Sequence, residues 1–455
     1  MPNKATIGLV LVPVMLLTAL PAWAGGRSEL RGQDIVIGNW WADYDVNTFQ
    51  PRNELEAETL AYRRRLLNEH GFRMSYRNIA GWGDMLQTAA LSIMAGQPAA
   101  SAFVLIPSWA MTLHRQGLIA PIQHAAVDFS PKRPGDGRTD WNQGIRNLFT
   151  FGGNTYALGV GYGDSLQAMV IFFNKRLFRE AGLDPELPYN MQRDRTWTWE
   201  NFLPIARQLT RDIDGDGIID TWAMTPDLAT HVINAIVSSN GANYVDRDPA
   251  TGRFVNATGR PEFLEALQFA MLLRDEGVMM PPPEGAHWTW YQSAFIDGIT
   301  AMAVEPLHVR GNLQNMTDDW GMVMFPMGPR ATDFVVYVYE NVIVIPSTFA
   351  PDEVSRIVYA IDLWNRPVRD TPYAWQDGLW HLFRDARAVT ETMAIVRNPN
   401  LVQWQYHVMI PGLNVGGITW SLYWHDGEPA QLIEAVSLAW NALIADANAG
   451  LVASP

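Results

Sequence analysis

Short apolar runs alternate with helical stretches along most of this sequence, and the alternation constrains the fold more than any other feature. The run at 34–41 (DIVIGNWW) precedes a helical stretch at 54–70, which Gly71 would end. The runs at 72–79 and 101–106 are each followed by a further helical stretch. Because parallel neighbouring strands need a crossover between them, this order predicts an α/β fold with mostly parallel sheets.

The second half of the chain continues the same pattern. A helix is expected from Trp199, with Thr198 as its N-cap. Strands are expected at 298–304 and 320–328, and a pair of strands within 335–347. Helices are expected at 260–278, 352–366 and 430–450. We see no repeat and no low-complexity linker, so any division into two lobes requires several crossings of the chain.

The first 24 residues read as a secretory signal peptide. Lys4 supplies a positive start, Ile7–Leu20 is apolar, and Ala22-Trp23-Ala24 matches a small-x-small cleavage site. The apolar run is shorter than the roughly 20 residues that span a bilayer. We therefore expect cleavage after Ala24 and a periplasmic protein. The chain has no cysteine, which excludes disulfides and a cysteine-linked lipid anchor.

Charge and aromatic content narrow the class of ligand. The net charge is −14, which argues against nucleic acid and anionic membranes as partners. The 19 tryptophans have two interpretations. They can form a large aromatic core, or they can line a carbohydrate site, since indole faces stack on the C–H faces of sugars.

The stretch TRDIDGDGIIDTWA at 210–223 resembles the opening of a calcium-binding loop. With Asp212 at position 1 of an EF-hand, positions 3, 5 and 9 are also Asp, but position 12 is Ala223 where the bidentate Glu should stand. No second helix follows, so calcium sensing is excluded. Two interpretations stay open: an Asp-Gly turn, or a structural calcium ion. The metal-ligating candidates are Asp212, Asp214, Asp216 and Asp220.

Sequence motifs for the common hydrolases and nucleotide-binding proteins are absent. There is no G-x-S-x-G, no Walker A loop, no G-x-G-x-x-G after a strand and no H-E-x-x-H. A carboxylate pair for glycoside hydrolysis leaves no fixed spacing, because the fold sets it. A secreted glycoside hydrolase or lyase acting on oligosaccharides therefore remains an alternative. A calcium-dependent adhesion module is a weaker one, since only half of the loop motif is present.

Three segments in a fixed order resemble extracellular solute-binding proteins of family 1, the maltose-binding-protein-like class that serves ABC sugar importers. They are FFNKRLFREAGL at 172–183, TWENF at 198–202 and GITAM at 298–302. Phe173 stands where the family usually has Tyr. The resemblance covers nearly the whole chain after the signal peptide.

The resemblance implies a type II periplasmic-binding-protein fold, with a ligand cleft between two α/β lobes. The N-terminal lobe would comprise 25–157 and 330–385, and the C-terminal lobe 158–329 and 386–455. Crossings are expected near Leu158–Met169, near Gly321–Pro329 and near 385. The protein would be a monomer that captures a mono- or oligosaccharide, closes on it and delivers it to a membrane permease. No catalysis and no functional cofactor are expected.

Ligands of open α/β sheets lie beyond the carboxyl ends of the strands, which points to side chains directly after the strands. The candidates from the first lobe are Trp40, Trp41, Asp43, Trp82, Ser108 and Trp109. The remaining candidates are Asp164, Asp227, Glu305, Tyr339, Glu340, Trp375 and Trp420. Relatives that bind maltose carry a Trp shortly after the Ala-Met pair; here Glu305 and His308 stand there, which argues against maltodextrin specificity.

Overall fold

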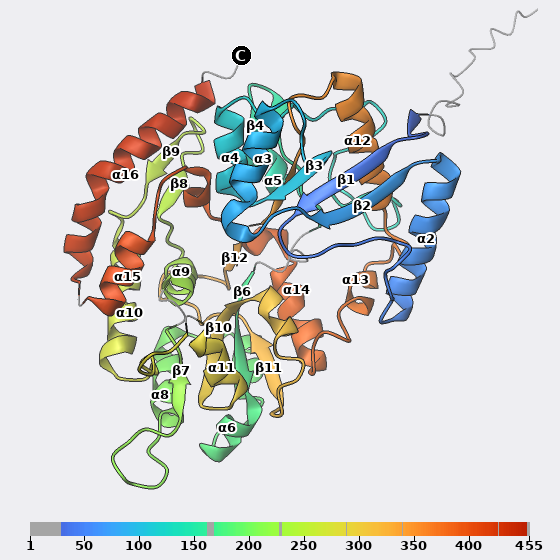
Figure 1. The fold of residues 1–455 in the computed structure, drawn as a ribbon. Coiled ribbons are helices and arrows are strands. Elements are labelled where there is room, and N and C mark those ends of the chain that lie inside the picture. The colour runs from blue at the N-terminus through green and yellow to red at the C-terminus, as the bar shows by residue number, and fades with distance from the viewer. Residues whose placement is uncertain are drawn as a thin grey trace, which may run out of the picture.

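The computed structural model describes residues 29–452 apart from 162–167, 227–229, 288, 339 and 426. Two four-stranded sheets form the centres of an upper and a lower lobe (Figure 1). The first sheet has the order β13-β3-β1-β2 and the second the order β11-β6-β10-β7. The predicted α/β class is confirmed. The predicted signal peptide lies outside the described residues.

The first sheet consists of β1 (Asp34–Asn39), β2 (Arg73–Asn78), β3 (Ala102–Leu105) and β13 (Val342–Val344). Strand β1 pairs in parallel with both β2 and β3, whereas β13 is antiparallel to β3. Its helices are α2 (Glu54–His70), α3 (Met85–Met94), α4 (Pro107–Arg115), α5 (Gln143–Leu148) and α12 (Pro351–Trp364). Helix α2 ends where predicted, because Gly71 adopts the left-handed conformation with φ of 68°.

The second sheet consists of β6 (Met169–Asn174), β7 (Trp222–Met224), β10 (Thr300–Pro306) and β11 (Trp320–Val323). Its helices are α6 (Lys175–Glu180), α7 (Leu187–Arg193), α8 (Trp199–Leu209), α9 (Thr230–Ser239), α10 (Pro261–Asp275), α11 (Trp290–Ile296) and α14 (Met393–Val396). The C-terminal helices α15 (Gly416–Trp424) and α16 (Pro429–Val452) pack on α10. Thr198 caps α8 as predicted, its side chain accepting a hydrogen bond from the Asn201 amide. No described helix is long and apolar enough to cross a membrane.

The expectation of mostly parallel strands is wrong for the second sheet. Strand β6 pairs antiparallel with both β10 and β11, and only β10 and β7 are parallel. Strand β6 follows the passage from the first lobe, so it enters the sheet without a crossover helix that would fix a parallel direction. The strands predicted within 335–347 also do not pair with each other. Strand β12 (Val336–Val338) pairs with β14 (Val402–Trp404), and β13 joins the first sheet.

Smaller elements complete the chain. The short strands form two hairpins, β4 (Thr150–Phe151) with β5 (Asn154–Thr155) and β8 (Val245–Arg247) with β9 (Phe254–Asn256). The short helical segments are η1 (Trp82–Asp84), η2 (Leu307–Gly311), α13 (Ala374–Asp377), η3 (Ala388–Thr392), η4 (Pro399–Leu401) and η5 (Tyr406–Met409).

Strand contacts bracket the passages between the lobes. Leu158 bridges Ile343 of the first sheet, whereas the Ala168 carbonyl accepts a hydrogen bond from Leu307 beside the second. On the return, Met327 bridges Thr198 before Val342 pairs with Leu105. The boundary predicted at 329/330 lies between the second pair of contacts, whereas the boundary predicted at 157/158 lies directly before Leu158, which still pairs with the first sheet. Both boundaries stay predictions.

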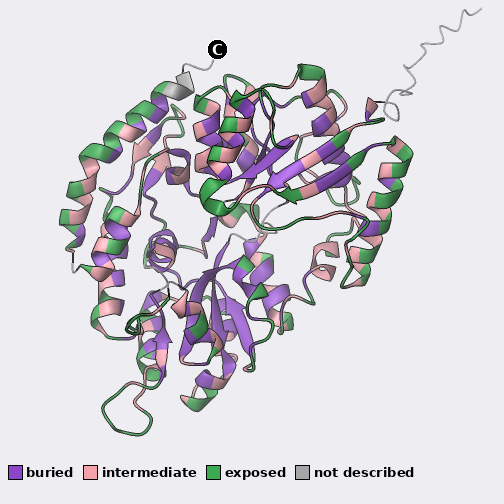
Figure 2. Cartoon of the chain, in the orientation of Figure 1, coloured by how far each residue is buried: buried purple, intermediate pink, exposed green. Residues whose placement is uncertain are grey.

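The second sheet is deeply buried. Strands β6, β10 and β11 are buried along their whole length (Figure 2). Gly321 in β11 is required by this packing: a Cβ there would lie 2.3 Å from a ring carbon of Phe173 and 2.9 Å from one of Tyr189. A dense core of this kind supports a lobe that moves as one body.

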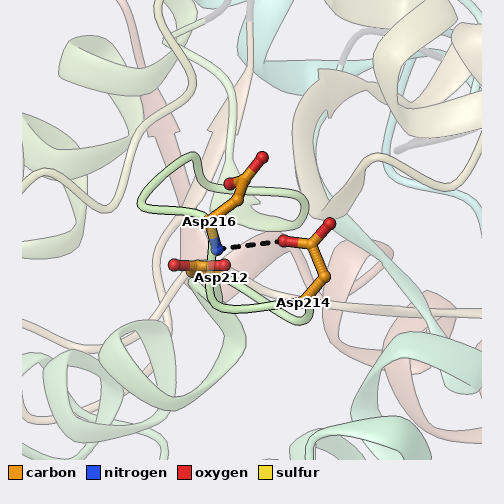
Figure 3. Close-up of side chains that lie close together, drawn as sticks. All are labelled: Asp212, Asp214 and Asp216. Carbon is orange, nitrogen blue, oxygen red and sulfur yellow. Dashed lines mark hydrogen bonds between the residues drawn. The ribbon is translucent and has the colours of Figure 1, made fainter.

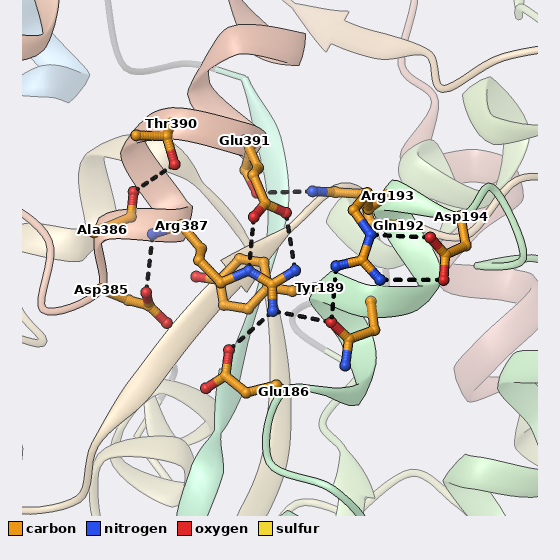
Figure 4. A network of polar contacts seen from close by, with 12 residues as sticks. Glu186, Tyr189, Gln192, Arg193, Asp194, Asp385, Ala386, Arg387, Thr390 and Glu391 are labelled. Carbon is orange, nitrogen blue, oxygen red and sulfur yellow. Dashed lines mark hydrogen bonds and ion pairs between the residues drawn. The ribbon is translucent and has the colours of Figure 1, made fainter.

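A polar network fastens the last passage to the second lobe (Figure 4). Lys175 is buried and bonds both Glu186 and Asp385, while Arg387 bonds Glu186 and Glu391. Burial alone would lower the pKa of Lys175, but the hydrogen bonds that its ammonium group donates to Asp385 and Glu186 raise it. Lys175 therefore stays charged and holds the chain near 385 on the second lobe. The crossing predicted near 385 lies at this attachment, and its boundary stays a prediction.

Candidate functional site

Four of the predicted tryptophans gather at one edge of the first sheet. Trp40 and Trp41 directly follow β1, Trp82 opens η1 after β2, and Trp109 lies in the first turn of α4 after β3. The carboxyl ends of parallel strands meet at one edge of a sheet, and this brings the four indoles together although they are up to 69 positions apart in the chain.

Trp40 is the centre of this tryptophan cluster. Its ring centroid lies 4.9 Å from that of Trp41, 5.2 Å from Trp82 and 5.5 Å from Trp109. All three neighbours meet it edge to face, with interplanar angles of 76° to 82°. Trp82 and Trp109 also contact each other, at 4.7 Å. The rings support one another, because edge-to-face contacts are favourable between aromatic quadrupoles.

Two of the four rings face solvent. Trp41 is 52% exposed and Trp82 is 53% exposed, whereas Trp40 and Trp109 are partly buried. Half-exposed indoles that rest on other indoles form a firm apolar surface. Contiguous exposed apolar surface of this kind marks an interaction site more often than a scattered single side chain does.

Buried Asn39 shapes the turn that presents the cluster. Its Oδ1 accepts hydrogen bonds from the amides of Trp41 at 2.8 Å and Ala42 at 3.0 Å, and its Nδ2 donates to the Ala42 carbonyl. The prediction from sequence missed this residue, although an Asn at a strand end is a common turn signal. The Asp43 carboxylate accepts a hydrogen bond from the Asn78 amide at 2.7 Å, which ties the same loop to the end of β2.

The other first-lobe candidate, Ser108, is partly buried in the first turn of α4, beside Trp109. Pro107 of the same turn lines a small cavity with Trp404 and Gln405. This edge of the first sheet therefore borders residues that were predicted to belong to the second lobe.

Glu305 and Glu340 are placed differently from what the prediction requires. Glu305 lies in β10 with 1% of its surface exposed, and Glu340 lies between β12 and β13 with 3% exposed. A contact with a ligand needs an accessible carboxylate, so the lobes would have to move before either could bind one.

The two late tryptophans lie apart from each other. Trp420 is 44% exposed on α15, and its ring centroid is 6.4 Å from that of Trp424. Trp375 lies in α13, where the guanidinium of Arg397 sits 4.9 Å from its ring centroid. The predicted contacts Asp164, Asp227 and Tyr339 lie outside the described residues.

Trp375 lines a groove beside α2 that the sequence did not reveal. The groove has a volume of about 440 Å³, and its walls come from α2, residues 132–134, Asp140, residues 160–161, residues 364–375 and Arg397. Six separate stretches of chain build it, so no local motif signals it.

The acidic loop projects from the second lobe between α8 and β7 (Figure 1). Asp212, Asp214 and Asp216 each place a carboxylate oxygen within 4.8 Å of the other two (Figure 3). All-oxygen donors suit calcium. The same carboxylates also accept hydrogen bonds from backbone amides of the loop. Asp212 accepts them from Gly215 and Gly217, and Asp214 accepts one from Asp216. The carboxylate of Asp220, the fourth candidate, accepts a hydrogen bond from the Ile213 amide. The geometry is thus compatible with both predicted interpretations.

Comparison with known proteins gives a family match and several structural neighbours. The sequence profile described as "Bacterial extracellular solute-binding protein" matches residues 58–353. No curated protein matches the chain in sequence.

Three solved structures illustrate the likeness in fold. An ABC substrate-binding protein of Listeria monocytogenes in complex with cycloalternan has a TM-score of 0.60 at 16% identity, covering 91% of this chain and 99% of its own. A cyclic alpha-maltosyl-1,6-maltose binding protein of Arthrobacter globiformis has 0.60 at 15% identity, covering 90% and 98%. UgpB of Mycobacterium tuberculosis, in complex with glycerophosphocholine, has 0.61 at 14% identity, covering 90% and 98%.

Proposed function

This chain belongs to the bacterial extracellular solute-binding proteins, and on that premise we propose that it captures a carbohydrate between its lobes for an ABC importer. The observation that carries the proposal is the tryptophan cluster of Trp40, Trp41, Trp82 and Trp109. Exposed indole faces are suited to the apolar C–H faces of sugar rings, while polar groups around them bond the hydroxyls. Among the relatives in fold, the Listeria protein was solved in complex with cycloalternan, and the Arthrobacter protein is a cyclic alpha-maltosyl-1,6-maltose binding protein.

A choline-containing ligand is the main competitor, since one relative in fold was solved with glycerophosphocholine. Quaternary ammonium groups are held in aromatic cages whose rings surround the cation, each within about 6 Å of it. Here the rings touch one another at 4.7 to 5.5 Å between centroids, which leaves no space among them for such a group. The cluster is a platform, by which we mean packed indoles with an exposed apolar surface. Such a surface favours binding of a broad, flat group such as a sugar ring.

The proposed mechanism is binding without bond cleavage. A sugar that contacts both lobes has more contacts in the closed state, so it favours closure by its differential affinity. Small backbone changes in the three passages are enough for such a hinge motion. The closed monomer, exported to the periplasm, would then be the form that a permease recognises.

The proposal includes no cofactor for binding. The proposal does include a structural calcium ion in the loop, bound by Asp212, Asp214 and Asp216. Asp220 supports the loop by accepting a hydrogen bond from the Ile213 amide. The ion would neutralise three exposed carboxylates that otherwise repel one another, far from the tryptophan cluster.

Calorimetric titration of the purified protein with a panel of neutral oligosaccharides tests the proposal, with glycerophosphocholine and choline as competitors. We expect at least one oligosaccharide to bind and to bind more tightly than either choline compound. Tighter binding of glycerophosphocholine than of any sugar would contradict the carbohydrate assignment.

The same samples should be incubated and analysed for products by chromatography. Unchanged oligosaccharides are expected. Cleavage of the bound sugar would instead support the alternative of a secreted glycoside hydrolase or lyase.

A further inference from the structure

The groove beside α2 has an unusual concentration of basic side chains. Its lining includes two carboxylates, Asp140 and Asp370, and six basic residues: Arg63, Lys132, Arg133, Arg366, Arg369 and Arg397. The whole chain has a net charge of −14, so the basic groove is not a general property of the surface.

Three of the six cations are neutralised by carboxylates. Lys132 pairs with Asp370, Arg366 pairs with Asp362, and Arg369 bonds three acidic groups, which are Glu54, Glu58 and Asp377. Burial works to raise the pKa of Asp370, but hydrogen bonds from Lys132 and Gly137 outweigh it and lower that pKa. These three cations already have carboxylate partners, so they form the walls of the groove and need no charge from a ligand.

Arg63 is held in place without being neutralised. Its guanidinium carbon lies 4.5 Å from the ring centroid of Trp364 and 5.2 Å from that of Tyr44. Its Nε is buried and has no hydrogen-bond partner, and within the described part of the chain no carboxylate forms an ion pair with it. A buried donor without an acceptor is unfavourable, so a ligand acceptor at this position would be favoured.

Arg133 is a second cation of the groove whose side chain forms no ion pair among the residues described. Asp136, whose pKa is lowered by Arg138 and also by the charge of Arg133, forms its ion pair with Arg138. The backbone amide of Arg133 also bonds Asp136, whereas its side chain is exposed. Arg133 comes from the loop at 132–134 and Arg63 comes from α2, so the two line the groove from different elements.

We infer that this groove is a binding site for a small anion, whose carboxylate or phosphate group Arg63 and Arg133 hold. The guanidinium fork matches the two oxygens of either group and stays charged at any physiological pH. A volume of about 440 Å³ lies within the usual range for small-ligand sites, and Trp375 offers an apolar wall for the body of the ligand.

The site goes beyond the proposed function, because it does not depend on what the tryptophan cluster binds. Arg397, at the end of α14, lines the groove from the second lobe, whereas α2 belongs to the first. An anion held by Arg63 and Arg133 that also reaches Arg397 would contact both predicted lobes, and its binding would then be coupled to the angle between them.

Titration calorimetry at constant ionic strength tests the inference with two anionic probes, inorganic phosphate and galacturonate, and with galactose as the neutral match. Arg63→Gln and Arg133→Gln remove one guanidinium each. Arg65→Gln is the matched control, because Arg65 is an exposed arginine without an ion pair on the same helix, outside the groove. We expect one or both anions to bind, and to bind about tenfold more weakly in each groove variant.

The outcomes separate the sources of the anion. Binding of phosphate alone assigns a phosphate ligand, and binding of galacturonate alone assigns a sugar acid. The inference is overturned if neither anion binds, if Arg133→Gln has no effect, or if Arg65→Gln weakens binding equally. Arg133 is exposed, so its variant is informative even if Arg63→Gln unfolds. Galactose affinity should not change in any of the three variants.

Discussion

Asn39 illustrates how a single buried side chain positions a binding surface. Its amide group supplies both a donor and an acceptor, so it satisfies three backbone groups of the turn that carries Trp40 and Trp41. The turn cannot relax toward solvent without leaving those groups and the buried Asn39 unbonded. Preorganisation of this kind lowers the entropy that a ligand must otherwise overcome on binding.

Substitution of Trp82 tests most directly whether the tryptophan cluster binds the sugar. Trp82→Ala removes a ring that is 53% exposed and contacts two other indoles. We expect an oligosaccharide to lose about 2 kcal/mol of binding free energy, roughly a thirtyfold weaker Kd, as for other aromatic anchors. Calorimetry on the variant measures this.

Trp380 provides the control for that variant. It is 42% exposed and lies outside the cluster. Trp380→Ala should leave the sugar affinity unchanged. An equal loss in the two variants would mean that the substitution acts through overall stability and not through the platform.

His407 gives a prediction about acid stability. Burial lowers the pKa of His407 from 6.5 to about 4, and its ring packs on Tyr244 at 5.2 Å between centroids. The unfolded chain takes up a proton near pH 6.5 but the folded chain does not, so stability falls as the pH drops from 6.5 toward 4. At pH 5 the loss from this one group should be about 2 kcal/mol relative to pH 7.

Denaturant unfolding of the wild type and His407→Gln at the two pH values isolates this contribution. The variant has no group at this position that titrates in the range, so its stability should fall by about 2 kcal/mol less. Parallel losses in both proteins would show that other groups control the acid response.

At the scale of elements, the acidic loop is a helix-to-strand turn whose carboxylates already cap its own amides. All four accept hydrogen bonds from loop N–H groups, Asp216 from the Ile218 amide, which explains how the turn holds its shape by itself. Asp212, Asp214 and Asp216 also place one carboxylate oxygen each within 4.8 Å of one another. A cation there would add stability without rebuilding the loop.

We therefore predict that calcium stabilises the second lobe and leaves sugar binding alone. Binding to the native state alone adds about 2.7 kcal/mol at a hundredfold excess over Kd. A chelator should lower the melting temperature, and calcium but not magnesium should restore it. Asp214→Asn should remove the response to chelator. If chelator does not change the melting temperature of the wild type, the calcium prediction is contradicted and the loop is an Asp-Gly turn without an ion.

On the scale of the whole molecule, each of the two lobes has its own four-stranded sheet, and the chain is predicted to pass between them three times. The buried β6, β10 and β11 make the second lobe stiff, and the bonds of Lys175 to Glu186 and Asp385 attach the last passage to it. Bending should therefore be concentrated in the passages, because deforming either densely packed lobe would cost more free energy.

Closure on a ligand predicts a smaller radius of gyration. Small-angle scattering with and without a bound oligosaccharide, at concentrations where calorimetry shows saturation, should detect the compaction. Trp82→Ala at the same sugar concentration serves as a control, because it should stay mostly unliganded. An unchanged radius in the saturated wild type would rule out closure as the consequence of binding.

Local chemistry allowed several features to be predicted correctly from the sequence. The α/β class, the stop at Gly71 and the cap at Thr198 depend on residues close together in the chain, whose preferences act wherever the segment lies. The positions of Trp40, Trp82 and Trp109 after strands followed from the same local pattern combined with the geometry of parallel sheets. Their contact in the structure agrees with that reasoning, although their role in binding stays a proposal.

Tertiary structure alone decided the features that depend on distant segments. The antiparallel placement of β6, the burial of Glu305 and Glu340, and the groove of Arg63 and Arg133 each require partners more than 100 positions away in the sequence. No periodicity or spacing encodes such pairings, because they follow from how the passages bring the lobes together. A carboxylate or guanidinium looks alike in sequence whether it is exposed or buried, and only packing determines its surroundings.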